Sequence, residues 1–141
     1  MAILASTPDN LQAKKLIEEL DLSCVIFKLS HTPRITGWTK RDAKICAQQY
    51  KNYLFLLKKY PGKVIPPNKN IDDFWHEHIL FTRKYHEDTL KIFGEYLHHQ
   101  PGEPTKEKHI YLRSKNSPKY FEKTFDEVTQ ELYFLEFGEY L

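Results

Sequence analysis

The stretch IDDFWHEHILFTRKYHEDTLKIFGEYLHHQP, residues 71–101, carries five of the seven histidines of the chain. Its apolar residues recur at three- and four-residue spacing, which is typical of a helix with one buried face. Nothing interrupts this pattern before Gly94, where a residue without a side chain favours a break. We therefore expect one bent helix, or two helices in series, from about Asn70 to about His98.

The segment before this stretch has the clearest helical signature in the chain. Thr39 and Asp42 have the spacing of a capping box, in which each side chain satisfies a free backbone N–H at the helix start. Pro61 and Gly62 end the helix, and the two prolines of VIPPNKN make the connector extended. The residues of its apolar stripe are Ala43, Cys46, Ala47, Tyr50, Tyr53, Leu54 and Leu57.

Two shorter helices are expected at the amino-terminal end. Thr7 and Pro8 resemble a helix start, with the threonine as the cap and the proline at the first helical position. The apolar face of this helix is formed by Ala13, Leu16, Ile17 and Leu20. Residues 21–31 fit either a β-branched strand or a short helix, and the spacing of Leu22, Val25, Ile26 and Leu29 favours the helix.

Beyond Pro101 the helical period disappears. Residues 100–117 form a long loop in this interpretation, with a short extended piece at His109–Arg113. Ser117 and Pro118 repeat the helix-start pattern, so a last helix is expected over about 118–137. The chain is then a single all-α, bundle-like domain of five or six helices spanning residues 1–141.

Composition narrows the class of protein. The net charge of +2 supplies no strong field for nucleic acid or an anionic membrane, so neither is an expected partner. The start MAILASTPDN lacks the basic region of a secretory signal, and two cysteines give no disulfide framework. These features favour the cytoplasm. Glycine-rich phosphate loops, GxSxG elbows and CxxC motifs are missing from the sequence.

The central stretch places its histidines on two different faces. At about 100° per residue, His76 and His78 point about 200° apart, so a helix does not let both bind one metal ion. Asp72 and His76 are four residues apart and share a face, which is the spacing that makes the two histidines of HExxH effective ligands. HExxH itself is absent from the chain. The sequence therefore indicates a divalent-metal site that begins with Asp72 and His76.

A third ligand must come from another part of the chain. The candidates are His31, His98, His99 and His109, and we take His99 as the third ligand. One carboxylate and two imidazoles suit an iron site or a zinc site with an open position, and the sequence does not choose between iron and zinc. Carboxylates in the first turn of a helix also have a simpler explanation, the interaction of Asp72 and Asp73 with the helix dipole.

Three neighbouring residues are assigned to the core or to the support of the metal ligands. His78 lies in the middle of an apolar stripe and needs a hydrogen-bond partner, for which a tyrosine hydroxyl or a backbone carbonyl would serve. Trp75 is expected in the core, and Tyr85 or His78 would orient the ligands from behind. Cys46 is on a buried stripe, so we expect an inert thiol.

A second interpretation makes the protein a non-enzymatic interaction module. In it the Trp-His core is structural, and the loop 100–119 binds a protein partner of unknown identity. The loop residues assigned to that contact are Lys106, Lys108, Tyr111 and Arg113.

The region Gly37–Pro101 resembles the helical region of the glycine-rich-domain-containing-protein-like family. Members carry an Asp-x-x-Trp-His-x-His core followed by a tyrosine, an acidic residue, a glycine and a late histidine. The matching residues here are Asp72, Trp75, His76, His78, Tyr85, Asp88, Gly94 and His98 or His99. The resemblance implies that the first four act as a unit, either as a site or as a packing motif. With five glycines the chain lacks the glycine-rich tail.

Overall fold

The computed structural model describes residues 7–31, 37–99, 109–111 and 122–141. Within them, six helices and one two-stranded ribbon follow in the order α1 (Asn10–Glu18), α2 (Ser23–Ser30), α4 (Lys40–Lys59), α5 (Lys69–Leu80), α6 (Thr82–Phe93), β1 (His109–Tyr111), β2 (Glu122–Thr124) and α7 (Phe125–Phe137). The predicted helical fold is confirmed. No helix in these ranges is long and apolar enough to cross a membrane.

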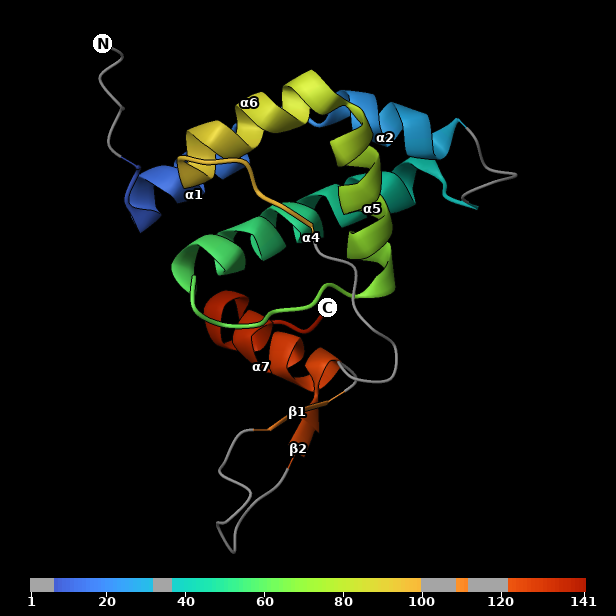
Figure 1. The fold of residues 1–141 in the computed structure, drawn as a ribbon. Coiled ribbons are helices and arrows are strands. Elements are labelled where there is room, and N and C mark those ends of the chain that lie inside the picture. Colours follow the sequence, from blue (N-terminus) through green and yellow to red (C-terminus); the bar gives the residue numbers. More distant parts are fainter. Residues whose placement is uncertain (1–6, 32–36, 100–108, 112–121) are drawn as a thin grey trace, which may run out of the picture.

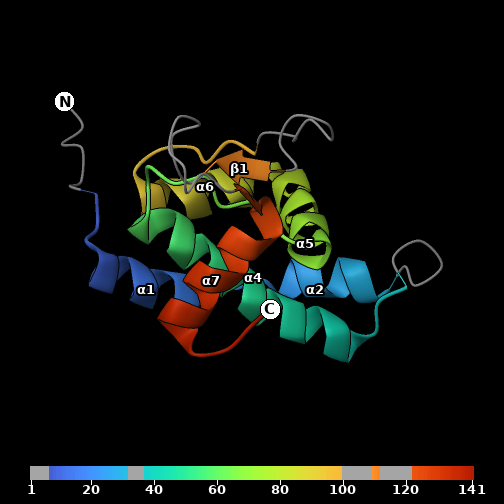
Figure 2. The same ribbon diagram turned by 90° about the horizontal axis from the view of Figure 1, so that it is seen from below.

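The longest helix, α4, is the centre of the fold. It packs against α1, α2, α5 and α7, and Figure 1 shows it running between α1, α2 and α6 on one side and α7 on the other. Seen from below, α7 crosses α4 (Figure 2). Thr39 and Asp42 form the expected capping box, and Lys58 and Lys59 lie near the negative end of the helix dipole. The predicted stripe is buried except for Leu57, which is partly buried, and Phe55 and Leu56 are buried in addition.

Helix α1 begins two residues later than the sequence indicated. Asp9, not Thr7, is the cap, because its carboxylate accepts from the backbone N–H of Gln12 while the Gln12 side chain accepts from Asp9 N–H. This reciprocal pair satisfies two free N–H groups at once, whereas the residue three positions after Thr7 is Asn10, not the Glu or Gln of a capping box. The short second helix, α2, forms as predicted, with Val25 and Leu29 buried.

The central stretch forms two helices in series. Phe81 leaves the helical conformation with ψ 70°, so α5 ends there and α6 begins at the next residue. Gly94 ends α6 with a left-handed φ of 76°, and a Cβ at this position would lie 2.6 Å from Thr7 Oγ1. The expected continuation of the helix to His98 is wrong, because the chain reverses at Gly94 and leaves residues 96–99 non-helical.

The carboxyl-terminal helix also starts later than expected. Residues 122–124 pair with residues 109–111 as an antiparallel ribbon, with Ile110 opposite Lys123, and α7 begins only at Phe125. At residues 122–124, strand pairing therefore replaces the helix that was expected there. Strand β1 falls within the extended piece predicted at residues 109–113, and α7 ends at Phe137 as expected. The Ser117–Pro118 helix start and the rest of the predicted loop lie outside the described residues.

The core is rich in buried tyrosines, and each hydroxyl has a partner. Tyr50 contacts His78, Tyr133 contacts Asn52, and Tyr53 donates to the carbonyl of Ile65. Burial raises the pKa of Tyr53 well above its usual value, and the charge of Asp72 adds to the effect. Among the described residues, no buried side-chain nitrogen or oxygen atom lacks a hydrogen-bond partner. The tyrosines therefore supply both apolar volume and fixed polar contacts.

Candidate metal centre

Helix α5 separates its residues into a buried and a solvent-facing side. Asn68 caps the helix by accepting a hydrogen bond from the backbone N–H of Ile71. The side that packs against α2, α4 and α6 consists of Ile71, Phe74, Trp75 and His78. Asp72 and His76 are on the other side, where the side chains retain 34% and 57% of their exposure. As the helical period required, His76 and His78 face different environments.

Asp72 and His76 are close enough to share one ligand. His76 Nε2 lies 3.5 Å from Asp72 Oδ1, across one turn of α5. In a tetrahedral site with metal–donor distances of about 2.0–2.2 Å, two donor atoms are about 3.3–3.6 Å apart. This pair therefore already has a separation that suits simultaneous binding of a metal ion.

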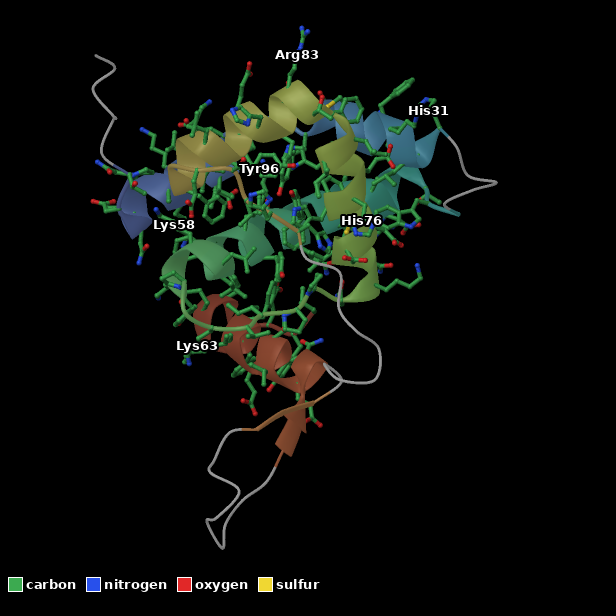
Figure 3. The ribbon with its side chains drawn as sticks, viewed as in Figure 1. His31, Lys58, Lys63, His76, Arg83 and Tyr96 are labelled. Carbon is green, nitrogen blue, oxygen red and sulfur yellow. The ribbon has the colours of Figure 1, made fainter. Side chains whose placement is uncertain are left out.

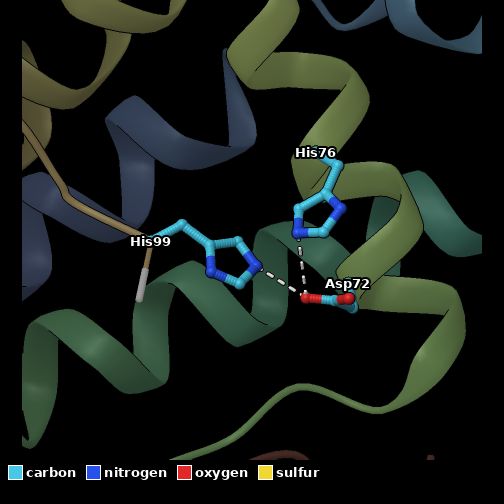
Figure 4. A group of neighbouring side chains, drawn as sticks. All are labelled: Asp72, His76 and His99. Atoms are coloured by element: carbon cyan, nitrogen blue, oxygen red, sulfur yellow. Dashed lines mark hydrogen bonds and ion pairs between the residues drawn. The ribbon is translucent and has the colours of Figure 1, made fainter. Parts of the chain in front are cut away.

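His99 approaches the same carboxylate from the non-helical segment after α6. Its Nε2 lies 2.6 Å from Asp72 Oδ1, although the two residues are 27 positions apart in the chain. Because an ionised carboxylate only accepts hydrogen bonds, His99 Nε2 is the donor in this contact. Figure 4 shows both imidazole rings turned toward the oxygen atoms of Asp72. One donor atom from each of Asp72, His76 and His99 lies within 4.8 Å of the other two.

Trp75 and Tyr85 hold the His99 segment in place. The Trp75 ring lies against the His99 ring with 4.1 Å between centroids. Trp75 Nε1 donates to the Tyr85 hydroxyl, which in turn donates to the carbonyl oxygen of Leu97. Burial raises the pKa of Tyr85 well above its usual value even though the Trp75 hydrogen bond lowers it, so the hydroxyl stays protonated. The rotation of His99 is therefore limited by the tilted ring contact with Trp75 and by a hydrogen bond two residues away.

His78 belongs to a separate, buried network. Its Nδ1 lies 2.7 Å from the Tyr50 hydroxyl, and its Nε2 lies 2.9 Å from Asp88 Oδ2. Asp88 also pairs with Lys84 at 3.1 Å. Burial opposes ionisation of Asp88, but the hydrogen bonds from His78 and Lys84 outweigh it and hold the pKa of this carboxyl below its usual value. The hydrogen bonds and ring contacts of His78 are with Tyr50, Asp88 and Tyr85, and none of these residues belongs to the group of Asp72, His76 and His99.

A tyrosine hydroxyl or a backbone carbonyl was the expected partner of His78, and Tyr50 is one of its two partners. The carboxylate of Asp88, the other partner, was not expected in that role. The signal was present in the sequence, because Asp88 is three residues after Tyr85 and four before Ile92, which places all three on one face of α6. A carboxylate on an otherwise apolar face needs a buried partner. The helix break at Phe81 then determines that this partner is His78.

The other predicted site residues have different positions. His31 ends α2 and stacks on Phe27, and His98 is exposed beside His99. His109 and Tyr111 are in β1, but their side chains are outside the described part of the structure. Lys106, Lys108 and Arg113, which were assigned to partner binding, lie wholly outside it. Cys46 is buried as expected, and burial raises the pKa of its thiol to about 12.

An open pocket of about 770 Å³ borders the histidine cluster. One wall comes from α4 and the connector before α5, and the other from α5 and residues 97–99. Asp72 and His99 belong to both the pocket wall and the ligand group. A metal ion held by this group would therefore have the pocket beside it.

A comparison with protein families matches most of the chain. A family model described as UCP032817-like covers residues 12–123, more than half of the chain. The chain belongs to the UCP032817-like family. The UCP032817-like match extends from α1 into β2 and includes Asp72, His76 and His99. No curated protein and no solved structure matches the chain, and none of these comparisons supports the resemblance to the glycine-rich-domain-containing-protein-like family.

Proposed function

We propose that this protein binds one divalent metal ion, iron or zinc, through Asp72, His76 and His99. The observation that carries the proposal is the approach of His99 to the Asp72–His76 pair from a segment 27 residues away. Two residues one helical turn apart meet often by chance. A third donor that lies within 4.8 Å of both has to be positioned by the fold.

The chemistry of the donors favours iron or zinc over magnesium or calcium. Two imidazole nitrogens are poor ligands for the hard alkaline-earth ions but suit zinc and iron. One carboxylate and two histidines also leave coordination positions for water or another molecule, as catalytic sites do. The proposal therefore includes metal-dependent chemistry on a bound molecule, with Trp75 and Tyr85 as positioning residues for His99.

The distances within the group indicate a small rearrangement on metal binding. Asp72 and His99 are at hydrogen-bond distance, 2.6 Å, so a metal ion would replace the proton between them and separate the two atoms by somewhat less than an ångström. His76 is already at the required separation from Asp72. Because His76 is the most exposed of the three, its side chain can complete the site without repacking the core.

The test is elemental analysis of untagged protein purified without chelator. Wild type is expected to hold about one equivalent of iron or zinc, and His76→Ala and His99→Ala are expected to lose it. His86→Ala is the matched control, because His86 is an exposed histidine on α6 outside the ligand group. Metal-free wild type that also fails to bind added Zn²⁺ or Fe²⁺ would end the proposal, as would equal metal content in all four proteins.

One part of the interaction-module interpretation, the structural role of the Trp-His core, has support from the burial of two residues. Trp75 and His78 are buried, with 5% and 0% exposure, as a packing role requires. These residues are distinct from the proposed ligands, so a structural Trp-His core and a metal site are compatible. We therefore propose packing roles for Trp75 and His78 alongside metal binding by their neighbours.

A further inference from the structure

The pocket beside the histidine cluster has apolar walls. Leu57 contributes from α4, Val64, Pro66 and Pro67 from the connector, and Trp75 from α5. The Tyr53 hydroxyl in the same wall is already used by the carbonyl of Ile65. Ligand pockets in proteins commonly combine such apolar walls with a few polar groups that fix one end of the ligand. Here Asp72 and His99 are polar groups at the α5 side of the pocket.

The charges around the pocket favour an anion. Two lysines, Lys63 and Lys69, line it, and Asp72 is the one carboxylate in its described wall. Lys69 is paired with Asp73, at 2.9 Å. Lys63 has its ammonium group over the Tyr60 ring, 5.8 Å from the centroid, and no carboxylate within ion-pair distance in the described part of the chain. A divalent ion on Asp72, His76 and His99 would add positive charge at the other side.

Lys63 and the histidine cluster are at separate places along the pocket. Figure 3 shows Lys63 on the connector below the end of α4 and His76 on α5. Residues 63–68 of the connector line the pocket together with Asp72 and His99. The rest of a ligand that binds the metal would therefore contact Leu57, Pro66 and Trp75.

We propose that this pocket binds a small monocarboxylic acid with an apolar tail, its carboxylate on the open positions of the metal and its tail against Leu57, Val64 and Pro66. This inference rests on the proposed metal site. The metal binds the carboxylate group. The apolar tail leaves water on binding, so the affinity should depend on the length of the tail. Each buried methylene is expected to raise affinity by up to about fourfold.

The test is calorimetric titration of Zn²⁺-loaded protein with butanoate, hexanoate and octanoate, and with octylamine as the opposite charge. Affinity is expected to increase along the acid series, by about tenfold or more from butanoate to octanoate, and octylamine is expected not to bind. Val64→Ser should reduce the increase in affinity from butanoate to octanoate, because Val64 lines the pocket. Val64 is also exposed, so a polar residue at this position should not disturb the fold.

Leu80→Ser is the matched control, since Leu80 is similarly exposed but does not line the pocket. It should leave the acid series unchanged. Protein that holds Zn²⁺ but shows equal affinity for the three acids would overturn this inference and leave the metal site standing. Protein that holds no metal would overturn both, so the two failures are distinguishable by the metal content alone.

Discussion

Tyr85 donates a hydrogen bond to the carbonyl oxygen of Leu97, two residues before His99. The same hydroxyl accepts from Trp75 Nε1, whose ring lies against His99. One phenol therefore connects α6, α5 and the returning segment that carries the third proposed ligand. The position of His99 depends on an atom that does not itself belong to the ligand group.

Tyr85→Phe is expected to weaken both the fold and the metal site. Loss of the hydroxyl leaves Trp75 Nε1 and the Leu97 carbonyl without their partner, which costs about 1–3 kcal/mol of unfolding free energy. Metal affinity should fall by about 10- to 100-fold, as is typical when a residue that orients a ligand is removed. Urea unfolding of the metal-free protein and Zn²⁺ titration measure the two effects separately.

Tyr133→Phe is the control for this prediction. Tyr133 is equally buried and accepts a hydrogen bond from Asn52, but it is in α7, outside the ligand group. It should lower the unfolding free energy by a similar amount and leave Zn²⁺ affinity unchanged. If the two variants lost metal affinity equally, Tyr85 would have no specific role in positioning His99.

Asp88→Asn is expected to destabilise the protein in a pH-dependent way. The pKa of Asp88 is lowered in the fold, so its ionised form stabilises the native state above the unfolded pKa of about 3.9, and this contribution is lost as pH falls through the folded value. The difference in unfolding free energy between wild type and variant should be about 1–3 kcal/mol at pH 7 and smaller at pH 3. A difference that stays constant from pH 7 to pH 3 would contradict this role.

Cys46 is expected to resist thiol reagents while the protein is folded. Its thiol is buried and donates to the Asn70 carbonyl, and burial, with a contribution from the charge of Asp73, raises its pKa to about 12. At pH 8 almost no thiolate is present for reaction. In a Cys24→Ser background, reaction with a disulfide reagent should be at least about a hundredfold slower in buffer than in denaturant. Rapid modification of the folded variant would show that the α4–α5 contact opens.

Gly94→Ala is expected to lower the unfolding free energy by more than 1 kcal/mol. The position has a left-handed φ, and the added Cβ would lie 2.6 Å from Thr7 Oγ1. Gly62→Ala is the control, since Gly62 has open space around it and no left-handed φ, and it should be close to neutral. Thr7→Gly combined with Gly94→Ala should recover part of the loss, and equal stability of the two alanine variants would refute the steric argument.

Most helices could be predicted from local patterns. The capping box at Thr39, the stripe of α4 and the opposite orientations of His76 and His78 follow from a period of 3.6 residues, which needs no information from the rest of the chain. The pairing of Asp72 with His76 is local for the same reason. Errors arose where two local signals competed, as at Thr7 and Asp9, or where strand pairing replaced helix at residues 122–124.

The sequence by itself determined the faces of the helices and the two members of the proposed site that share one turn of α5. Only the tertiary structure decided that His99 lies beside Asp72 and that Asp88 is a partner of His78. Both contacts depend on where the chain changes direction, at Phe81 and at Gly94. At Gly94 a side chain would lie too close to Thr7, which favours glycine there. Such contacts between distant segments follow from packing, which no local periodicity encodes.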